Sequence, residues 1–226
     1  MNIGLHTPIG VIAGLISMAA YLPYAYEIVR GRSRPNRATW IIWSIVCGLL
    51  FASYNAAAGG ASRWVPLSDA LGPTLIAALA IWCGEGALSS LDLWCLTVAG
   101  VSAVGWALTG SPMVSLSVNL ILDFLGAIPT FRNEVWHPRS EPALVWRTFL
   151  LSNVLNVVAI EQWCWRSAAY PVYAVLVSGF VCALIHLPAL RRVIRLMWFR
   201  NGRFLGSTLA GRRQDRFEAR VLSERF

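Results

Sequence analysis

The sequence contains no lysine and few acidic residues, and this shortage of charge determines its class. Only 13% of its 226 residues are charged, whereas 57% are hydrophobic. A soluble domain carries about 25% charged residues, because polar side chains must cover its surface. The composition therefore predicts an integral membrane protein and argues against a soluble globular domain.

The sequence motifs of common enzyme classes are also absent. There is no HExxH, no GxSxG, no P-loop and no acidic DxxD pair. No nucleic-acid-binding module is recognisable, and the arginines gather in short loops and in the C-terminal region. We therefore expect no nucleic-acid partner, and a catalytic function is less favoured than a non-catalytic one.

The five cysteines lack the spacing of a metal site or a disulfide framework. Cys47, Cys83, Cys95, Cys164 and Cys182 form no CxxC pair, and most of them lie in apolar runs. In such surroundings a cysteine behaves as a small hydrophobic residue. We expect no disulfide, no metal ion and no cofactor.

What the chain does contain is a series of long apolar segments. A membrane-spanning helix needs about 20 predominantly apolar residues. Seven segments qualify, at residues 8–29, 38–58, 65–83, 91–108, 112–131, 143–160 and 170–190. The sequence predicts an all-α integral membrane fold with seven transmembrane helices.

The arginines fall mainly on one side of these predicted helices. Four lie between residues 30 and 37, three between residues 132 and 147, and ten from residue 191 onward. Only Arg63 and Arg166 lie on the other side. Because positively charged loops stay in the cytoplasm, we predict a plasma (inner) membrane protein with its N-terminus outside and its C-terminus inside. The basic C-terminal region is expected to contact anionic lipid.

An internal repeat relates the first three segments to the last three. Five pairs of prolines or tryptophans recur 104 to 107 residues apart: Pro8 and Pro112, Pro23 and Pro129, Pro35 and Pro142, Trp40 and Trp146, Pro66 and Pro171. Three helices reverse the direction of the chain, so the fourth helix restores it and makes the repeats parallel. We predict a first three-helix bundle at 1–86, a linker helix at 87–110, a second three-helix bundle at 111–192 and a basic cytoplasmic tail at 193–226.

A proline near the end of the first and of the fifth segment, each followed by a basic loop, resembles the PQ-loop superfamily. This superfamily includes the SWEET sugar transporters and the lysosomal exporters of cystine and cationic amino acids. The resemblance covers about residues 8–190. The family's proline–glutamine pair reads Pro23-Tyr24 and Pro129-Thr130 here, so both glutamines are absent.

The resemblance implies a SWEET-like fold with 3+1+3 helices that works by alternating access. It also implies that Pro23 and Pro129 act as hinges, because proline removes one backbone hydrogen bond and bends a helix. A static kink is the other interpretation of these prolines. The prolines that SWEET proteins carry in their second and sixth helices fall in loops here, at Pro35 and Pro142.

Asp123 is the most distinctive polar residue within a predicted helix. An ionised carboxylate at the centre of a bilayer costs about 3 kcal/mol on insertion scales, so it should face a cavity, pair with a cation or bind a proton. Asn119 stands one helical turn earlier on the same face. We predict a coupling or substrate-binding role for Asp123, against the alternative of a carboxylate satisfied by neighbouring Asn or Ser. Asp69, by contrast, is expected to be a polar cap near the outer surface.

Further amides and tryptophans complete the predicted substrate path. Asn55, Asn153 and Asn156 can hydrogen-bond a polar solute or, equally, join neighbouring helices. Trp40 and Trp146 correspond to each other in the repeat. They are either anchors at the membrane interface or aromatic walls of a binding site.

These features favour a transporter for a small polar solute, an expectation that depends mainly on analogy of fold. Two alternatives stay open. The first is an integral-membrane enzyme that acts on a lipid or prenyl substrate, with Asp123 and another acid as proton donor. The second is a non-transporting membrane scaffold that uses the basic tail.

Overall fold

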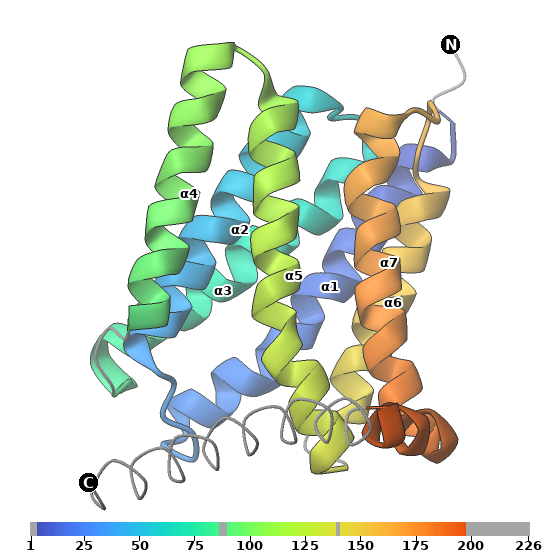
Figure 1. Ribbon diagram of the computed structural model, residues 1–226. Helices are drawn as coiled ribbons and strands as arrows, with labels where there is room; N and C mark the ends of the chain where they lie inside the picture. Colours follow the sequence, from blue (N-terminus) through green and yellow to red (C-terminus); the bar gives the residue numbers. More distant parts are fainter. Residues whose placement is uncertain (1–3, 86–89, 139–140, 198–226) are drawn as a thin grey trace, which may run out of the picture.

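The protein is described by a computed structural model over residues 4–85, 90–138 and 141–197, and this part of the chain is helical without strands. The elements are α1 (His6–Val29), α2 (Arg37–Ala57), the short 3₁₀ helix η1 (Ala61–Arg63), α3 (Trp64–Cys83), α4 (Ser90–Thr109), α5 (Pro112–Trp136), α6 (Ala143–Val158) and α7 (Trp165–His186) (Figure 1). Residues 188–197 form a further helical segment after α7. Residues 198–226 of the predicted tail lie outside the described residues.

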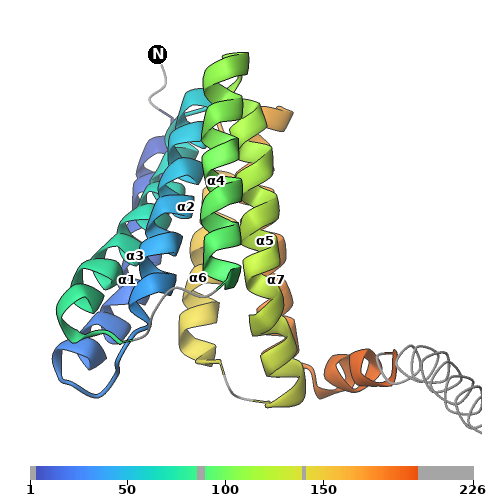
Figure 2. The same ribbon diagram turned by 60° about the vertical axis from the view of Figure 1, so that its left-hand side comes forward.

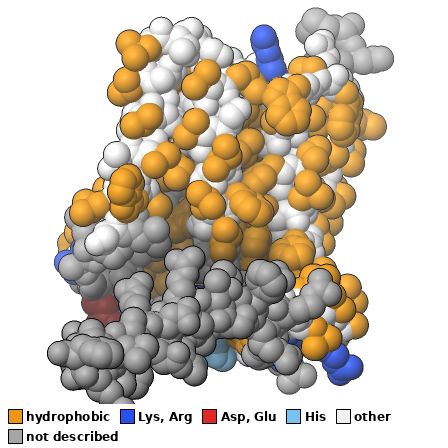
Figure 3. All heavy atoms as spheres, in the orientation of Figure 1, with side chains coloured by type: hydrophobic (Ala, Val, Ile, Leu, Met, Phe, Trp, Pro, Cys, Tyr) orange, Lys and Arg blue, Asp and Glu red, His pale blue; other side chains and the backbone are white. Residues whose placement is uncertain are grey.

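The long helices have the length and composition of membrane spans. Five of them qualify: α1, α2, α3 together with η1, α5 and α7. The helices α4 and α6 contribute shorter apolar stretches, Leu93–Thr109 and Ala143–Val158. Hydrophobic side chains spread over the middle of the face in Figure 3, whereas charged side chains appear only near its two ends. Apolar side chains on the outside are stable in lipid, so the chain is a membrane protein.

The predicted helices are present, but the end of α5 and both ends of α7 differ from the prediction. α5 extends five residues beyond its predicted end, to Trp136. α7 begins at Trp165 because Cys164 and Ser167 form a capping box around its first turn. It ends at His186 because Pro188 forces Leu187 out of the helical conformation, with φ −110° and ψ 89°.

The first three helices and the last three helices of the chain pack in the same pattern. α3 packs against both α1 and α2, and α7 packs against both α5 and α6. Two further seams join these groups, since α1 packs against α6 and α2 packs against α5. α4 lies alongside α5 and also contacts α2 (Figures 1 and 2).

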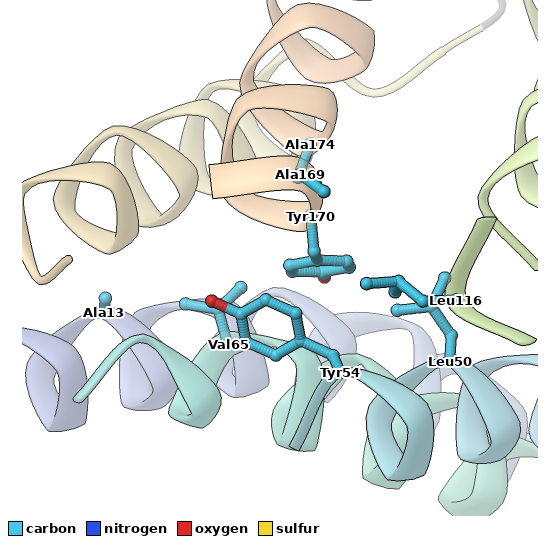
Figure 4. Close-up of a cluster of buried hydrophobic side chains, with 8 residues drawn as sticks. All are labelled: Ala13, Leu50, Tyr54, Val65, Leu116, Ala169, Tyr170 and Ala174. Carbon is cyan, nitrogen blue, oxygen red and sulfur yellow. The ribbon is translucent and has the colours of Figure 1, made fainter. Parts of the chain in front are cut away.

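A hydrophobic core seals the upper end of the bundle in Figure 1. Its residues come from α1, α2, α3, α5 and α7 (Figure 4): Ala13, Leu50, Tyr54, Val65, Leu116, Ala169, Tyr170 and Ala174. The Tyr54 hydroxyl donates to the Ser167 carbonyl at 2.8 Å and lies 2.6 Å from the Ser62 hydroxyl. These hydrogen bonds tie α2 and η1 to the start of α7, so the upper end is closed by both apolar packing and polar links.

The lower end of the bundle is held mainly by arginines. Arg37 donates to the carbonyl of Ala80 (3.1 Å), which also accepts from the Gly84 amide, and to the carbonyl of Gly84 (2.7 Å) just after α3. The Arg191 guanidinium lies 3.7 Å from the Glu134 carboxylate, and both side chains are largely buried. The segment 188–197 is thereby fixed against the end of α5.

Candidate functional site

A cavity of about 360 Å³ lies where α1, α2, α3, α5, α6 and α7 face one another. It extends from the sealed upper core to the level at which α2 and α6 begin. Its volume is at the lower end of the range for small-molecule sites. Its described lining is Tyr21, Thr39, Trp40, Trp43, Cys47, Leu50, Pro66, Asp69, Pro73, Asp123, Gly126, Ala127, Thr130, Trp146, Phe149, Asn153, Tyr170, Tyr173, Ala174, Val177 and Ser178.

Asp69, which the sequence analysis placed near the outer surface, lies within this cavity. Its carboxylate accepts a hydrogen bond from the Ser17 hydroxyl at 2.6 Å and another from the Tyr170 hydroxyl. Ser17 belongs to α1 and Tyr170 to α7, so one carboxylate joins three helices. The expected polar cap is thus a residue of the cavity, because packing of distant segments brings it there.

Asp123 lines the same cavity from α5. Its carboxylate accepts a hydrogen bond from the Tyr173 hydroxyl at 2.5 Å. Tyr170 and Tyr173 stand three residues apart on α7, and each donates to one of the two acids. No Arg or His is among the described lining residues, so the two carboxylates face the cavity without a cationic side chain beside them.

Aromatic rings form the lower part of the lining. Trp40 and Trp146, predicted as anchors or as walls, both line the cavity, and so does Trp43. The Trp43 ring lies so close to Gly126 that a Cβ there would be 2.9 Å from it. The Trp146 ring packs against Phe149 at 6.0 Å, and its Nε1 donates to Glu141 at 3.0 Å.

Asn153 lines this cavity and has one side-chain acceptor without a partner. Its side-chain nitrogen donates to the Ala174 carbonyl at 3.2 Å and to the Ser178 hydroxyl at 3.1 Å. These two bonds fix the orientation of the amide. The amide oxygen has no partner within the described residues, although the residue is only 6% exposed. A buried acceptor of this kind is costly unless something binds it.

Three other predicted residues do not line the cavity. Asn55 is exposed near the end of α2. Asn119 donates to Ser102 at 2.9 Å and to Ser115 at 3.1 Å, so it joins α5 to α4. Asn156 is buried in α6 and its amide has no partner within the described residues.

The two predicted hinge prolines lie in α1 and α5. Pro23 is an exposed residue inside α1, about two turns before its end. The backbone of Pro129 is helical, and its side chain lies outside the described part of the chain. Sequence reasoning missed Pro73, which lies inside α3 and lines the cavity, and the tyrosines of α7 that hold the two acids.

Comparison with protein-family models, with curated proteins and with solved structures finds no match to this chain. In the described part of the chain, no three His, Cys, Asp or Glu side chains gather closely enough to hold a metal ion. The chemistry of the cavity is therefore best inferred from its own side chains: two hydrogen-bonded carboxylates, one unpaired amide oxygen and a group of aromatic rings.

Proposed function

We propose that this protein is a transporter for a small polar solute and works by alternating access between two three-helix bundles. The first bundle is α1 to α3 and the second is α5 to α7, with α4 as the linker of a PQ-loop-like 3+1+3 fold. The observation that carries the proposal is the cavity between them, which holds two carboxylates among mostly apolar and aromatic side chains and is bounded at its upper end by a hydrophobic core. Alternating access requires a site of this kind at the interface of two repeats.

The cavity lining supports the repeat. Six pairs of lining residues lie 105 or 106 positions apart: Tyr21 and Ala127, Trp40 and Trp146, Trp43 and Phe149, Cys47 and Asn153, Asp69 and Ala174, Pro73 and Ser178. The packing supports it too. Exchanging the two bundles converts the α1–α6 seam into the α5–α2 seam, and both seams are present.

The arginines support an orientation for this fold. At the lower end lie the α1–α2 loop, with Arg30, Arg32 and Arg34, and the segment after α7, with Arg191 and Arg192. The upper end carries Arg63 and Arg166 (Figure 1). By the positive-inside rule the lower end is cytoplasmic, so the sealed core lies outside and the cavity faces inward.

A covalent lock tests the proposal. Ser62 and Ser167 lie on either side of Tyr54 at the sealed end, the first in η1 and the second in α7. We would introduce Ser62→Cys and Ser167→Cys into a chain whose native cysteines are replaced by alanine, and crosslink the pair with a short dimaleimide. Crosslinking should abolish solute uptake into proteoliposomes but leave binding from the cytoplasmic side intact.

Each single-cysteine variant, treated with the same reagent, is the matched control and should retain uptake. If a panel of sugars, amines, amino acids and nucleosides shows uptake that the crosslink leaves unchanged, alternating access across this seam is wrong. If no member of the panel crosses the membrane although some of them bind, the transporter proposal is wrong.

The acid pair also favours a second candidate, an integral-membrane enzyme. The sequence left Asp123 without an acidic partner, whereas Asp69 lines the same cavity. Two carboxyl groups in one cavity could act as general acid and base on a lipid or prenyl substrate. Turnover of such an analogue that is lost in both Asp69→Asn and Asp123→Asn, without solute uptake, would establish this alternative.

A further inference from the structure

We propose that the solute is an organic cation whose charged head carries N–H donors, that is, a protonated amine with a short apolar or aromatic body. This inference depends on the proposed function, because it names the substrate class of the same cavity. It follows from the unused hydrogen-bond acceptors of the lining, from its charge and from its aromatic content.

The two acids of the cavity can accept more hydrogen bonds than the neighbouring hydroxyls supply. The hydroxyl hydrogens of Ser17, Tyr170 and Tyr173 are already donated to Asp69 and Asp123. An ionised carboxylate accepts about four hydrogen bonds, so each acid retains capacity after these contacts. A ligand that brings donors can use this capacity.

The amide of Asn153 is a second, independent sign that the ligand carries hydrogen-bond donors. Its nitrogen is occupied by Ala174 and Ser178, and Ser178 in turn donates its own hydrogen to the Ala174 carbonyl at 2.6 Å. The group without a partner is therefore the oxygen, a buried acceptor on a residue that lines the cavity. An N–H group of a ligand would satisfy it, whereas a carbonyl or phosphate oxygen would not.

The charge of the cavity selects against other ligand classes. Asp69 and Asp123 line it from α3 and α5, and no Arg or His is among its described lining residues. An anion would meet carboxylates without any compensating cation, which is a strong penalty in a partly buried site. A neutral polyol would leave the carboxylates without a counter-charge.

The aromatic lining suits the apolar body and the charge together. Tyr21, Trp40, Trp43 and Trp146 all line the cavity. A cation over the face of a tryptophan or tyrosine gains about 0.5–2 kcal/mol from the ring quadrupole. The same rings provide van der Waals contact with a flat ligand, and the cavity of about 360 Å³ limits that ligand to a small one.

A pair of probes of the same shape tests the inference. Binding of 2-phenylethylammonium and of neutral 2-phenylethanol to the purified full-length protein would be measured by titration calorimetry at pH 7. We expect the ammonium to bind about tenfold or more tightly than the alcohol, since hydrogen bonds to charged groups are worth this much. Asp69→Asn and Asp123→Asn should each lower the affinity for the ammonium by a similar factor. Glu161 is an exposed acid outside the cavity, so Glu161→Gln should leave this affinity unchanged.

A cysteine-labelling measurement keeps both acids in place, so it does not depend on whether the Asp69 and Asp123 variants fold. Cys47 lines the cavity, so a variant that retains only this cysteine reports occupancy of the site. The ammonium should slow its modification by a membrane-permeant maleimide, and the alcohol at the same concentration should not. Equal protection by the two probes, or equal affinity for them, would overturn the inference.

The outcomes separate this inference from the transporter proposal. Uptake of a neutral sugar into proteoliposomes, with no affinity for the ammonium, would refute the cationic substrate and leave the transporter intact. Binding of the ammonium with the expected dependence on both acids, but without uptake, would support the chemistry of the site and refute transport.

Discussion

The Tyr173 hydroxyl donates a short hydrogen bond to Asp123, with 2.5 Å between the hydroxyl and carboxylate oxygens. Removing the hydroxyl with Tyr173→Phe leaves the carboxylate with one donor fewer in a partly buried site. We expect the free energy of unfolding to fall by about 1–3 kcal/mol. The measurement is chemical or thermal unfolding in detergent micelles.

The contact itself can be isolated with a double-mutant cycle. In a chain that already carries Asp123→Asn, Tyr173→Phe should lower the free energy of unfolding by clearly less than in the native chain. The difference is a coupling energy of about 0.5–3 kcal/mol. Tyr26→Phe, at an exposed tyrosine of α1, is the matched control and should change little. Additive costs for the two cavity substitutions would show that this hydrogen bond contributes nothing to stability.

Individual residues also show what the sequence could and could not predict. Asp123, Trp40 and Trp146 were identifiable because an acid inside an apolar helix and a repeated tryptophan are local signals. Asp69 was misplaced because its depth depends on partners 52 and 101 residues away, Ser17 and Tyr170. No periodicity in a single segment predicts such contacts.

At the scale of elements, the seam between α2 and α5 depends on a residue without a side chain. A Cβ on Gly126 would lie 2.9 Å from the Trp43 ring, so Gly126→Ala must displace that ring into the cavity or separate the two helices. We expect a lower unfolding temperature and weaker binding of the cationic probe. Thermal unfolding and calorimetry measure the two effects.

Gly48 provides the matched control for this prediction. It lies in the middle of α2, and a Cβ added there meets nothing within 4 Å. Gly48→Ala should stabilise the protein by about 0.5–1 kcal/mol, because glycine is unfavourable inside a helix. If the two substitutions change the stability equally, the close approach of Gly126 to the Trp43 ring does not contribute to it.

A second prediction at this scale concerns the segment after α7. Arg191 and Glu134 form a largely buried ion pair between residues 188–197 and the end of α5. Arg191→Gln removes the positive charge beside the buried Glu134 carboxylate. Breaking a buried ion pair in this way lowers the free energy of unfolding by about 3–5 kcal/mol. Arg32→Gln, which breaks the exposed pair with Glu27, should cost at most about 1 kcal/mol. Unfolding curves of the two variants give the comparison, and equal costs would contradict the burial argument.

Helix positions were predictable for a simple physical reason. The apolar runs, the arginine-rich loops and the Gly- or Pro-containing turns are all local, and they located each helix to within a few residues. The start of α7 was misjudged because its apolar run was taken to begin at Tyr170, beside Pro171, whereas the capping side chains Cys164 and Ser167 set the first turn earlier. The seams between helices were not predictable, since they depend on matching of distant surfaces.

At the scale of the whole molecule, two native cysteines lie at opposite ends of the bundle and can report its orientation. Cys164 is exposed at the start of α7 and Cys83 is exposed at the end of α3. Variants that retain only one of them would be treated on intact cells with a membrane-impermeant maleimide. We expect Cys164 to react and Cys83 to react only after the cells are opened.

The chemistry of Cys164 strengthens this test. A hydrogen bond with the Ser167 hydroxyl lowers the pKa of the Cys164 thiol below its ordinary value. More thiolate is then present at neutral pH, so labelling should be fast and should reach its maximum at a lower pH than for a free cysteine. Ser167→Ala should shift this pH dependence upward, and reaction of Cys83 in intact cells would reverse the proposed orientation.

The placement of both tyrosine donors on α7 has a consequence for the proposed transport cycle. Asp123 and Tyr173 belong to the same bundle, whereas Asp69 and Tyr170 belong to different ones. In the proposed cycle, opening of the outer seam would separate Asp69 from the Tyr170 phenol, while Asp123 would keep Tyr173. Asp69 would then keep only the Ser17 donor, whereas the donor of Asp123 would be unchanged. A shift in the infrared carboxylate band of Asp69 alone would be an intrinsic spectroscopic record of which side the protein faces.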